Sequence, residues 1–441
     1  MKPSRFNLFI ETDDGNKLAF NTISAALAEV LPDKYPVIQK ILSDPDSLDS
    51  DEEEELFHQL IAGKFLVDDQ TDEISQLKVL NRTQRFGKKT LVLTIAPTLS
   101  CNFKCDYCFE GQTRSTMNED TEKALLDFGE RHLRRSEKLM ITWFGGEPTL
   151  CLPTIERLQK SFQSLSSRYG VSVYPSGIVT NGYLLDKGMS ERLRDAGIRN
   201  AQVTLDGPQE IHDSRRKLQS GEGTFERILD NLKESARNLS ILLRINIDRE
   251  NLDSGYDLVG ILEKEGILPL VNVNFAQVTA TEGACADVKD RCLSGQEFSA
   301  TIVELYKRLL QRDFDKIAYP VLSSGAYCSA DSDGAFVVSP TGDLFKCWEE
   351  ISSDNEKSVG SVFSRKLEPF QEKNLNRFLS WDPFEKSGCL GCNILPICMG
   401  GCPNLGIKYG TREVGVCSSW KYNLKEMLHL KYLAEQNEER R

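Results

Sequence analysis

Three cysteines within eight residues are the clearest chemical feature of this chain. Cys101, Cys105 and Cys108 stand in the run Cys-Asn-Phe-Lys-Cys-Asp-Tyr-Cys. Three thiolates at this spacing can bind three irons of a [4Fe–4S] cube and leave the fourth iron open for a ligand. A zinc site is the alternative, but structural zinc is normally closed by four protein ligands, and no fourth ligand stands nearby.

A glycine-rich motif, Gly145-Gly146-Glu147-Pro148, follows the apolar run 139–144. Glycines let the backbone approach a ligand closely, and the Glu147 carboxylate can accept hydrogen bonds from a cationic amine. An ordinary tight turn is the alternative for such a sequence.

Two further polar motifs and an arginine also follow predicted strands. Thr180-Asn181-Gly182 and Thr204-Leu-Asp206-Gly207-Pro208 are either ligand-binding loops or simple turns, since Asn-Gly and Asp-Gly-Pro are turn formers. The planar fork of Arg216 suits a carboxylate, with a surface ion pair as the alternative. We interpret the nearby His212 as structural.

The middle of the chain alternates between strand-like and helix-like segments, which predicts a parallel sheet with helical crossovers. Active-site residues of such strand–helix barrels sit on loops after the strands, which is where the motifs above fall. The predicted strands are 91–96, 139–144, 173–180, 201–205, 241–247 and 270–278. The predicted helices are 119–134, 153–169, 184–196, 223–238, 252–265 and 296–312.

The two ends of the chain have a different character. Residues 1–85 open with strand-like runs at 6–11 and 17–21, followed by helix-like stretches at 23–31, 35–43 and 52–63 and by a polar linker from Ile74 to Lys88. Gly, Ser, Pro and Cys dominate from 323 to 420, as in a small domain held by metal. A charged final helix at 421–439 is expected to lie on the surface.

Seven cysteines gather in this C-terminal part. Cys328 precedes the run Gly342-x4-Cys347, and the series then continues through Cys389, Cys392, Cys398, Cys402 and Cys417. Taken alone, the spacing of the inner cysteines also suits a zinc ribbon. Of the 13 cysteines, Cys151, Cys285 and Cys292 remain unassigned.

The cysteine triplet, with an aromatic Tyr107 before Cys108, resembles the signature of radical S-adenosylmethionine (SAM) enzymes. That resemblance implies an α/β fold with a partial (β/α)6 TIM-like barrel at 86–315 and a catalytic cluster at the triplet. It also implies SAM cleavage to a 5′-deoxyadenosyl radical that abstracts hydrogen. The SAM-binding residues implied by the resemblance are Tyr107, Gly145, Gly146, Glu147, Thr180, Asp206 and Arg216.

The C-terminal cysteines resemble a SPASM domain, here 316–441, which carries two auxiliary [4Fe–4S] clusters. The resemblance assigns Cys389, Cys392, Cys398 and Cys417 to one cluster and Cys328, Cys347 and Cys402 to the other. The second set lacks a fourth thiolate, so either another residue completes it or its last iron is open. Three clusters predict about 12 irons per chain.

The N-terminal 85 residues resemble the winged-helix-like leader-recognition domain of enzymes that modify ribosomal peptides, with a structural cap as the alternative. The implied function is hydrogen abstraction from a precursor peptide with a leader, most simply forming a thioether crosslink, with electrons from a ferredoxin or flavodoxin. Carbon–carbon or carbon–oxygen crosslinking, epimerisation and formylglycine formation in sulfatases are the alternatives. A non-catalytic iron-sulfur or zinc interaction module is a further one.

Composition limits the remaining choices. A net charge of −12 argues against bulk nucleic-acid binding, and four histidines make a histidine-centred hydrolase hard to build. No apolar run reaches the ~20 residues of a membrane span. The N-terminus lacks the apolar stretch of a signal peptide, so a cytoplasmic location is expected. The catalytic base or hydrogen donor and the oligomeric state stay open.

Overall fold

The structure is a computed structural model that describes residues 1–12, 15–110, 114–279, 286–312, 314–320, 328–352, 354–409 and 416–439. Its contacts divide the chain into two compact units. The first contains Met1–Phe86, Tyr306–Cys328 and Trp381–Arg441, and the second contains Gly87–Leu305 and Ser329–Ser380. The three domains expected from the sequence, with boundaries near 85 and 315, stay a prediction.

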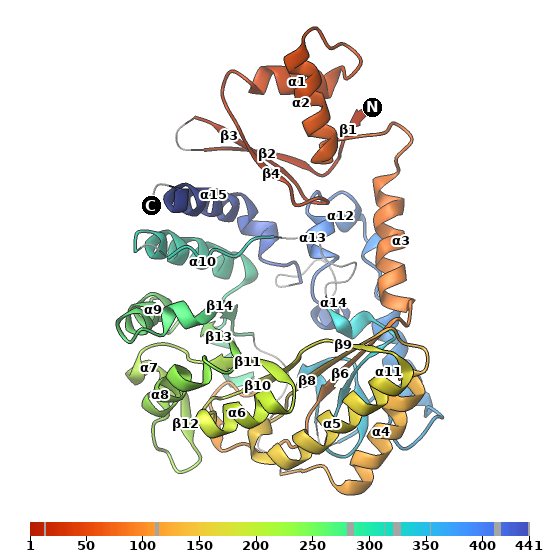
Figure 1. Cartoon of the computed structure of the whole chain (residues 1–441), viewed down its shortest axis with the longest axis vertical. Coiled ribbons are helices and arrows are strands. Elements are labelled where there is room, and N and C mark those ends of the chain that lie inside the picture. Colours follow the sequence, from red (N-terminus) through yellow and green to blue (C-terminus); the bar gives the residue numbers. More distant parts are fainter. Residues whose placement is uncertain are drawn as a thin grey trace. The chain divides into compact units, whose positions relative to one another are not determined.

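The second unit is built on a parallel sheet, as the sequence predicted (Figure 1). Its six main strands lie in the order β14-β13-β11-β10-β8-β6. Each strand is therefore next to the one that precedes or follows it in the sequence among these six, and all the pairings between them are parallel. The six are β6 (Thr90–Ile95), β8 (Lys138–Trp143), β10 (Ser176–Thr180), β11 (Ile198–Thr204), β13 (Ser240–Ile247) and β14 (Val271–Gln277). The predicted strands 91–96, 139–144, 173–180, 201–205, 241–247 and 270–278 are confirmed.

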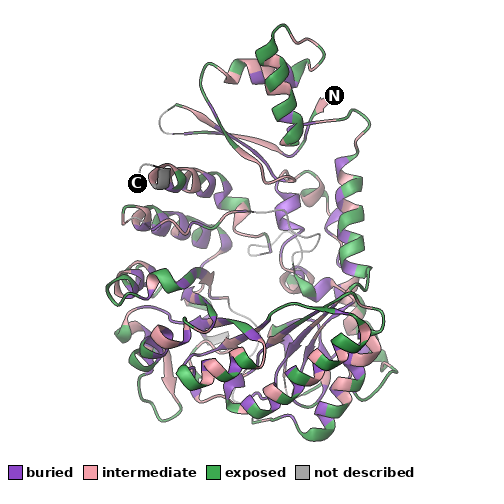
Figure 2. Cartoon of the chain, in the orientation of Figure 1, coloured by how far each residue is buried: buried purple, intermediate pink, exposed green. Residues whose placement is uncertain are grey.

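Helices connect these strands and cover one face of the sheet. Trp143 of β8 is fully buried and donates a hydrogen bond from its indole nitrogen to Gln159 of α5 at 3.1 Å. The predicted helices are all present, as α4 (Glu119–Leu133), α5 (Leu152–Tyr169), α6 (Lys187–Asp195), α8 (Phe225–Ser235), α9 (Ser254–Lys264) and α10 (Gly295–Leu310). Figure 2 shows how the strands are buried while the outer sides of these helices are exposed.

The opposite face of the sheet, here called the inner face, is identified on β13 and β14. Gly255 of α9 lies directly against the ring of Phe275, which places Phe275 on the helix-covered face. Ile245 is paired with Phe275 and shares that face. Because side chains alternate along a strand, Arg244 and Asn246 belong to the inner face.

Three short strands extend the sheet beyond β6, an extension that the sequence did not predict. β15 (Ala335–Val338) pairs with β6 in parallel, and β16 (Asp343–Phe345) and β17 (Gly360–Ser361) continue in antiparallel pairing. The hairpin turn between β15 and β16 contains Gly342 at a φ of 85°, a conformation that favours glycine. The segment around Cys347 thereby becomes part of the second unit.

The first unit contains a three-stranded antiparallel sheet of β2 (Asn7–Glu11), β3 (Lys17–Asn21) and β4 (Leu27–Val30), with β3 in the centre. Ala19 packs with Ile38 and Ile41 of α1 (Tyr35–Ser43) on one face. The neighbouring Leu18 and Phe20 point to the other face and pack with Ile397, Leu424 and Leu428. The sheet is therefore buried on both faces, and α15 (Trp420–Glu439), the final helix that was expected to pack on the surface, forms part of its cover.

Two expectations for the N-terminal region were wrong. The segment 23–31 is not helical, because Asn21 Oδ1 accepts hydrogen bonds from Ile23 N and Ser24 N and turns the chain into β4. The polar stretch 74–88 is not a linker but contains most of α3 (Glu73–Phe86). The sequence did not indicate this helix because the buried side of α3 includes polar side chains. One of them is Glu73, which accepts hydrogen bonds from Ser4 Oγ and Arg5 N.

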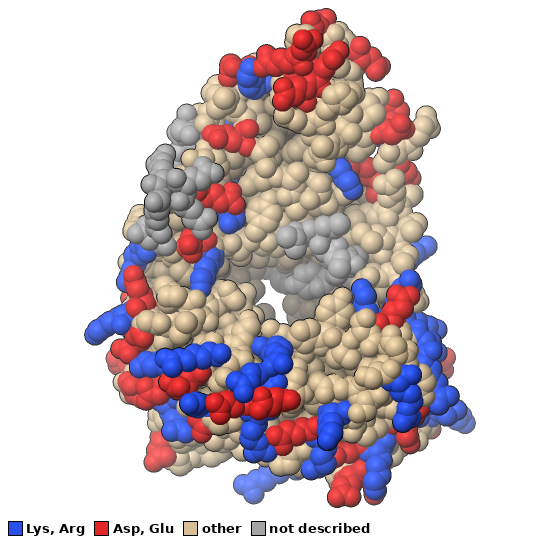
Figure 3. All heavy atoms as spheres, in the orientation of Figure 1, with Lys and Arg blue, Asp and Glu red and all other residues tan. Residues whose placement is uncertain are grey.

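An acidic run marks the start of α2 (Asp51–Ala62), where Ser50 Oγ accepts a hydrogen bond from Glu53 N. Carboxylates suit the positive end of the helix dipole, and acidic side chains gather in this region in Figure 3. The other elements are β1 (Lys2–Pro3), β5 (Leu66–Val67), β7 (Phe103–Cys105), β9 (Ser172–Val173), α7 (Gln209–Arg215), β12 (Arg216–Leu218), α11 (Pro369–Leu379), α12 (Ser387–Leu390), α13 (Leu395–Cys398) and α14 (Pro403–Tyr409). Among the described residues, no helix combines the length and the apolar character needed to cross a membrane.

Candidate functional site

The cysteine triplet lies on the loop that follows β6. Within this loop, β7 pairs antiparallel with β12, and the register places Cys105 opposite Arg216. Two candidates far apart in the sequence are thereby brought together. Burial raises the pKa of the Cys101 thiol to about 12 and that of Cys108 to about 11. A bound metal reverses this effect, because it takes the deprotonated thiolate as its ligand.

Gly145 and Gly146 hold the loop after β8 against the backbone that leads into the triplet. Gly146 N donates to Thr98 O at 3.1 Å, and Glu147 N donates to Ser100 O at 2.9 Å. A Cβ atom on Gly145 would lie 2.2 Å from Thr98 O, and one on Gly146 would lie 2.5 Å from Leu99 O and Ser100 O. Both glycines are therefore required by this close backbone approach.

We expect Gly146→Ala to disturb the cysteine loop. The added methyl group meets backbone oxygens that no side-chain rotation can move, so the loop must shift at a cost of about 1–3 kcal/mol. Iron content after anaerobic reconstitution and the thermal unfolding midpoint measure the effect. Gly177→Ala in β10 is the matched control, because its Cβ meets only ordinary contacts at 3.8 Å or more. An unchanged iron content and midpoint in Gly146→Ala would contradict the prediction.

The Glu147 carboxylate is completely buried at the centre of a hydrogen-bond network. Its Oε1 accepts from Thr149 N and Oγ1 at 3.1 and 2.5 Å and from Thr180 Oγ1 at 2.7 Å. Its Oε2 accepts from Asn181 N at 2.7 Å. Among the described residues Oε2 has this single donor, so it can accept a further hydrogen bond, such as one from a ligand amine. Thr180 thus positions Glu147, a role that the sequence did not reveal.

A second cluster surrounds the Tyr107 hydroxyl. Tyr107 donates to Asp206 Oδ2 and accepts from Arg216 Nη1 at 2.7 Å, while Asn246 Nδ2 lies 3.1 Å from the same hydroxyl and 3.2 Å from Asp206 Oδ1. Arg216 Nε is buried and has no hydrogen-bond partner in the part of the chain that the structure describes. A buried guanidinium with an unmatched donor fits a site for an anionic ligand group.

Sequence reasoning missed the ion pairs that support this cluster. Arg215 is buried and binds Asp248 at 3.0 and 2.9 Å, and its Nε lies 3.4 Å from Asp206. Arg291 binds Asp106 in the cysteine loop at 2.7 Å and also reaches Asp248 at 3.4 Å. The sequence signal was weak, because only the pair Arg215-Arg216 and the isolated Asp248 hinted at buried charge.

His212 is fully buried and holds the backbone of Asp206 in place. Its Nδ1 accepts a hydrogen bond from Asp206 N at 3.3 Å, and its Nε2 lies 3.0 Å from Thr224 Oγ1. Burial lowers the pKa of His212 to about 3. The structural role expected from the sequence agrees with this geometry.

Because the folded protein keeps His212 neutral, its stability should decrease at acidic pH. In the unfolded chain His212 binds a proton below its ordinary pKa of 6.5, whereas in the folded chain it stays neutral until about pH 3. The free energy of unfolding should therefore fall with decreasing pH, by up to about 1.4 kcal/mol per pH unit from this residue. Denaturant unfolding of the wild type and of His212→Gln between pH 7 and 5 measures the slope, with His58→Gln on the exposed side of α2 as control. Equal slopes in all three proteins would contradict the prediction.

Four of the C-terminal cysteines lie close together in the first unit. The thiols of Cys392, Cys398 and Cys417 lie near enough to Cys389 to act on its pKa, which burial and these neighbours raise to about 11. This is the set that the resemblance assigned to one cluster. Among the described residues, no three or more His, Cys, Asp or Glu side chains are placed to hold a single metal ion. A [4Fe–4S] cube does not need such convergence, because each cysteine binds a different iron.

The other predicted set is divided between the two units. Cys328, which is exposed, and Cys402 belong to the first unit, whereas the buried Cys347 belongs to the second. Their grouping around one cluster stays a prediction. Of the unassigned cysteines, Cys285 lies outside the described residues, while Cys292 packs near Tyr107 and Phe109, with its thiol 3.3 Å from Val288 O.

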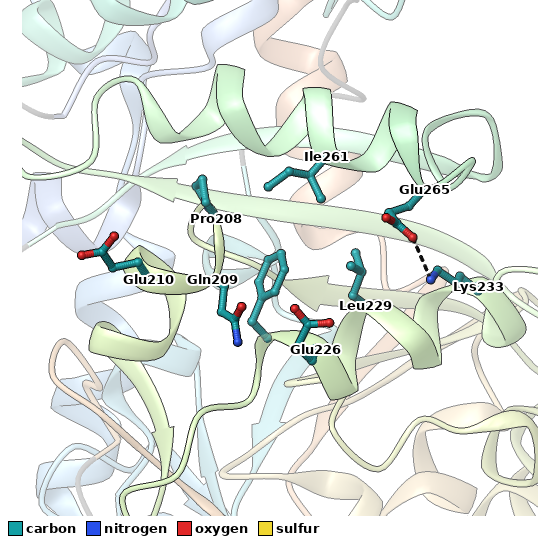
Figure 4. A pocket seen from close by; sticks show the side chains of 9 residues that line it. Pro208, Gln209, Glu210, Glu226, Leu229, Lys233, Ile261 and Glu265 are labelled. Carbon is teal, nitrogen blue, oxygen red and sulfur yellow. Dashed lines mark ion pairs between the residues drawn. The ribbon is translucent and has the colours of Figure 1, made fainter.

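A groove in the second unit lies away from these residues. It has a volume of about 540 Å³ and is formed at the start of α7 and along α8 and α9. Pro208, Phe225, Leu229 and Ile261 supply its apolar surface, and Figure 4 shows the ion pair between Lys233 and Glu265 at one end. None of the candidate site residues lines this groove.

Comparison with known families agrees with this site. Residues 95–255 match the model of the radical SAM superfamily, a range that includes the cysteine triplet and every predicted SAM-binding residue. These residues form a radical SAM domain. An iron-sulfur cluster and SAM binding follow from this family, and the donor atoms of the cysteine loop, Glu147 and Arg216 suit both groups.

Two curated relatives match different lengths of the chain. Fe-coproporphyrin III synthase of Methanosarcina barkeri is 27% identical over 195 residues, which cover 43% of this chain and 45% of that protein. The chain thus spans less than half of this relative. The radical SAM cyclopropyl synthase TigE of Paramaledivibacter caminithermalis is 22% identical over 471 aligned positions, which cover 96% of this chain and 95% of TigE.

Two solved structures share the fold of the radical SAM domain and its surroundings. anSMEcpe with bound AdoMet and a Cp18Cys peptide has a TM-score of 0.58 at 17% identity and covers 79% of this chain and 99% of its own. Streptococcus suis SuiB bound to its precursor peptide SuiA has a TM-score of 0.52 at 16% identity and covers 94% of this chain and 99% of its own. The expected α/β fold is thereby confirmed, whereas the winged-helix-like and SPASM assignments stay predictions.

Proposed function

We propose that the protein is a radical SAM enzyme that modifies a ribosomally made precursor peptide. The observation that carries this proposal is the joining of the cysteine loop to the Glu147 network by the backbone bonds of Gly146 and Glu147. This arrangement places a three-thiolate site beside a buried carboxylate with a free acceptor position. When bound, the reduced cluster and SAM supply hydrogen-atom abstraction from an unactivated carbon.

The residues of the chain have separate tasks in this proposal. Cys101, Cys105 and Cys108 bind three irons and leave one iron for SAM. Glu147 accepts a hydrogen bond from the SAM amino group, and the orphaned Nε of Arg216 faces its carboxylate. Asp206 and Tyr107 contact the ribose and the adenine. Arg215, Asn246 and His212 keep Asp206 in place by ion pairing and hydrogen bonding.

The peptide substrate is supported by the extent of the comparisons. The SuiB match covers 94% of this chain, so about 26 of the 441 residues are left unmatched, far fewer than the 86 N-terminal residues of the first unit. The N-terminal region thus has a counterpart in a protein whose structure was solved with its precursor peptide. We propose that the edge strands β2 and β4 offer a site where an extended leader can add as a further strand.

The C-terminal cysteines support two auxiliary clusters in this proposal, giving three per chain. The close group of Cys389, Cys392, Cys398 and Cys417 holds one of them. Cys328, Cys347 and Cys402 hold the other, whose fourth ligand is unassigned. A ferredoxin or flavodoxin supplies electrons, and the protein works in the cytoplasm.

We propose an intramolecular crosslink as the product, with a thioether from a cysteine sulfur as the first choice. Carbon–carbon and carbon–oxygen crosslinks and epimerisation share the hydrogen abstraction and remain alternatives. Sulfatase maturation is a second candidate, favoured by the anSMEcpe match, but that match covers only 79% of this chain. The SuiB match, which covers 94% of this chain, and the edge strands β2 and β4 give the peptide-leader function more support.

The test is anaerobic co-expression with a candidate precursor, found by searching the neighbouring genes for a short open reading frame with a leader and a core. A crosslinked peptide should lose the mass of two hydrogen atoms, and tandem mass spectrometry should locate the bond. Epimerisation should leave the mass unchanged and alter only the stereochemistry. Co-expression with a Cys105→Ala enzyme is the control. A precursor of unchanged mass and stereochemistry would refute the peptide substrate.

A further inference from the structure

Arg244 is a charged residue of the second unit that none of the tasks above uses. It lies on the inner face of β13, two residues before Asn246, and its backbone oxygen accepts a hydrogen bond from Leu205 N. Its side chain is half-buried. Among the described residues its only hydrogen bond joins its Nε to the neutral Oδ1 of Asn246 at 2.7 Å. Both Nη atoms of its fork thus remain available for a ligand.

Among the described residues no carboxylate is bonded to Arg244, although those of Asp206 and Glu349 lie near enough to raise its pKa. Arg215 forms ion pairs with Asp206 and Asp248, and the side chain of Arg216 donates to the Tyr107 hydroxyl, its one side-chain hydrogen bond to a described residue. Two guanidiniums, Arg216 and Arg244, therefore stand without a bonded carboxylate among the described residues. SAM carries a single carboxylate. Arg216 lies opposite Cys105 in the strand register and is the better placed of the two to receive it.

The backbone of Arg244 lies further from the strand end than that of Asn246, while its guanidinium reaches back to Asn246 and lies near enough to Tyr107 and Asp206 for their charges to act on its pKa. Asn246 contacts Tyr107 and Asp206 at the ends of the strands. Two residues along a strand correspond to about 7 Å, so the backbone of Arg244 lies one step further down the inner face. Burial lowers the pKa of Arg244, which shows that its charge is poorly solvated there. Half-buried charges of this kind are normally paired, and a planar guanidinium is matched best by a carboxylate.

A stack of three aromatic rings ends at Trp348, the residue before Glu349. Trp348 stacks on Phe144 at a ring distance of 5.5 Å, and Phe144 stacks on Phe109 at 6.4 Å. Trp348 is nevertheless 43% exposed. Glu349 lies close enough to Arg244 to raise the pKa of its guanidinium.

We propose that Arg244 binds a carboxylate of the precursor peptide, from an aspartate or glutamate next to the carbon that loses hydrogen. This inference rests on the proposed function and names a substrate feature that it leaves open. Arg244 then acts as a specificity residue: it fixes the register of the peptide on the inner face, and it takes no part in SAM cleavage. The C-terminal carboxylate of a peptide has the same chemistry, so the test must separate these two sources.

The experiment compares Arg244→Gln and Arg244→Lys with the wild type on the precursor peptide that the co-expression test identifies. A set of precursors carries single Asp→Asn or Glu→Gln changes, and one carries an amidated C-terminus. We expect one side-chain change to raise the KM for peptide about tenfold in the wild type and to have no further effect in Arg244→Gln. Arg244→Lys should restore part of the affinity. The SAM dissociation constant and the peptide-free formation of 5′-deoxyadenosine should stay unchanged.

Controls make the outcomes distinct. Arg237→Gln, which alters an exposed arginine on the opposite side of the sheet, should behave as the wild type. If Arg244→Gln fails to fold, as judged by iron content and melting temperature, Arg244→Lys and the peptide series with wild-type enzyme decide the question. Loss of SAM affinity in Arg244→Gln would overturn the inference, and so would a loss of peptide affinity in Glu349→Gln equal to that in Arg244→Gln. The inference also fails if the KM for peptide depends on the C-terminal carboxylate alone or on no carboxylate of the peptide. If the wild type modifies no precursor, the proposed function itself fails, and the inference fails with it.

Discussion

Cys105→Ala should abolish reductive cleavage of SAM while leaving the rest of the protein folded. The thiol is half-buried in β7, opposite Arg216, and supplies one of three protein ligands to the proposed catalytic cluster. Two cysteines cannot hold a cube whose fourth iron must also stay open for SAM. We therefore expect 5′-deoxyadenosine formation to fall to background and the iron content to fall from about 12 to about 8 per chain.

Iron and sulfide analysis, the electron paramagnetic resonance signal of the reduced protein and chromatography of 5′-deoxyadenosine measure these effects. Cys151→Ala is the matched control, because Cys151 has a similar intermediate exposure at the start of α5 but lies outside the triplet. Its iron content should stay at the wild-type value. A Cys105→Ala protein that retains full iron and activity would remove the basis for the catalytic cluster.

The six main strands of the central sheet and their helices were predictable because each carries its own local signal. The run 241–247 is apolar on one side and is followed by a helical pattern, and the structure has β13 and α9 there. Motifs placed after such strands must meet at one edge of a parallel sheet. The meeting of Glu147, Thr180 and Asn181 follows from that rule alone.

The features that the sequence did not reveal depend on contacts between distant residues. The extension of the sheet by β15 depends on pairing with β6, more than 200 residues away in the chain. The helix α3 looked like a linker because its buried side includes Glu73, Asn81 and Arg85. Polar residues of this kind become buried only when partners such as Ser4 are supplied by another segment. No local pattern can report such partners.

The same reasoning explains why Arg215 and Arg244 were overlooked while Arg216 was selected. Arg216 follows a family motif, whereas the other two arginines gain meaning only from the side chains around them. Arg215 satisfies two buried carboxylates, and Arg244 has a neutral amide as its bonded neighbour. Arg215 is therefore assigned a role in stability and Arg244 a proposed role in ligand binding, because their bonded partners differ.

Glu147→Gln should weaken SAM binding strongly without removing the cluster. The buried carboxylate has three donors on Oε1 and a single donor on Oε2. A glutamine can keep its oxygen toward Thr149 and Thr180, but its amide nitrogen then faces the N–H of Asn181 and the amino group of SAM. Donor meets donor, and the negative charge is also lost. Hydrogen bonds to charged groups contribute about 1.5–3 kcal/mol, so the SAM dissociation constant should rise about 10- to 100-fold.

Equilibrium binding of SAM to the anaerobically reconstituted proteins measures this change, with iron content as the check on the cluster. Glu156→Gln is the matched control, because Glu156 is a more exposed glutamate on α5 that pairs with Arg192 at 2.7 Å. Burial raises the pKa of Glu147, so its carboxylate is costly to keep ionised without a cationic ligand. SAM should therefore bind more weakly in the wild type as the pH falls and Glu147 becomes protonated, and Glu147→Gln should lose that dependence. A wild-type SAM affinity in Glu147→Gln would show that this carboxylate only supports the loop.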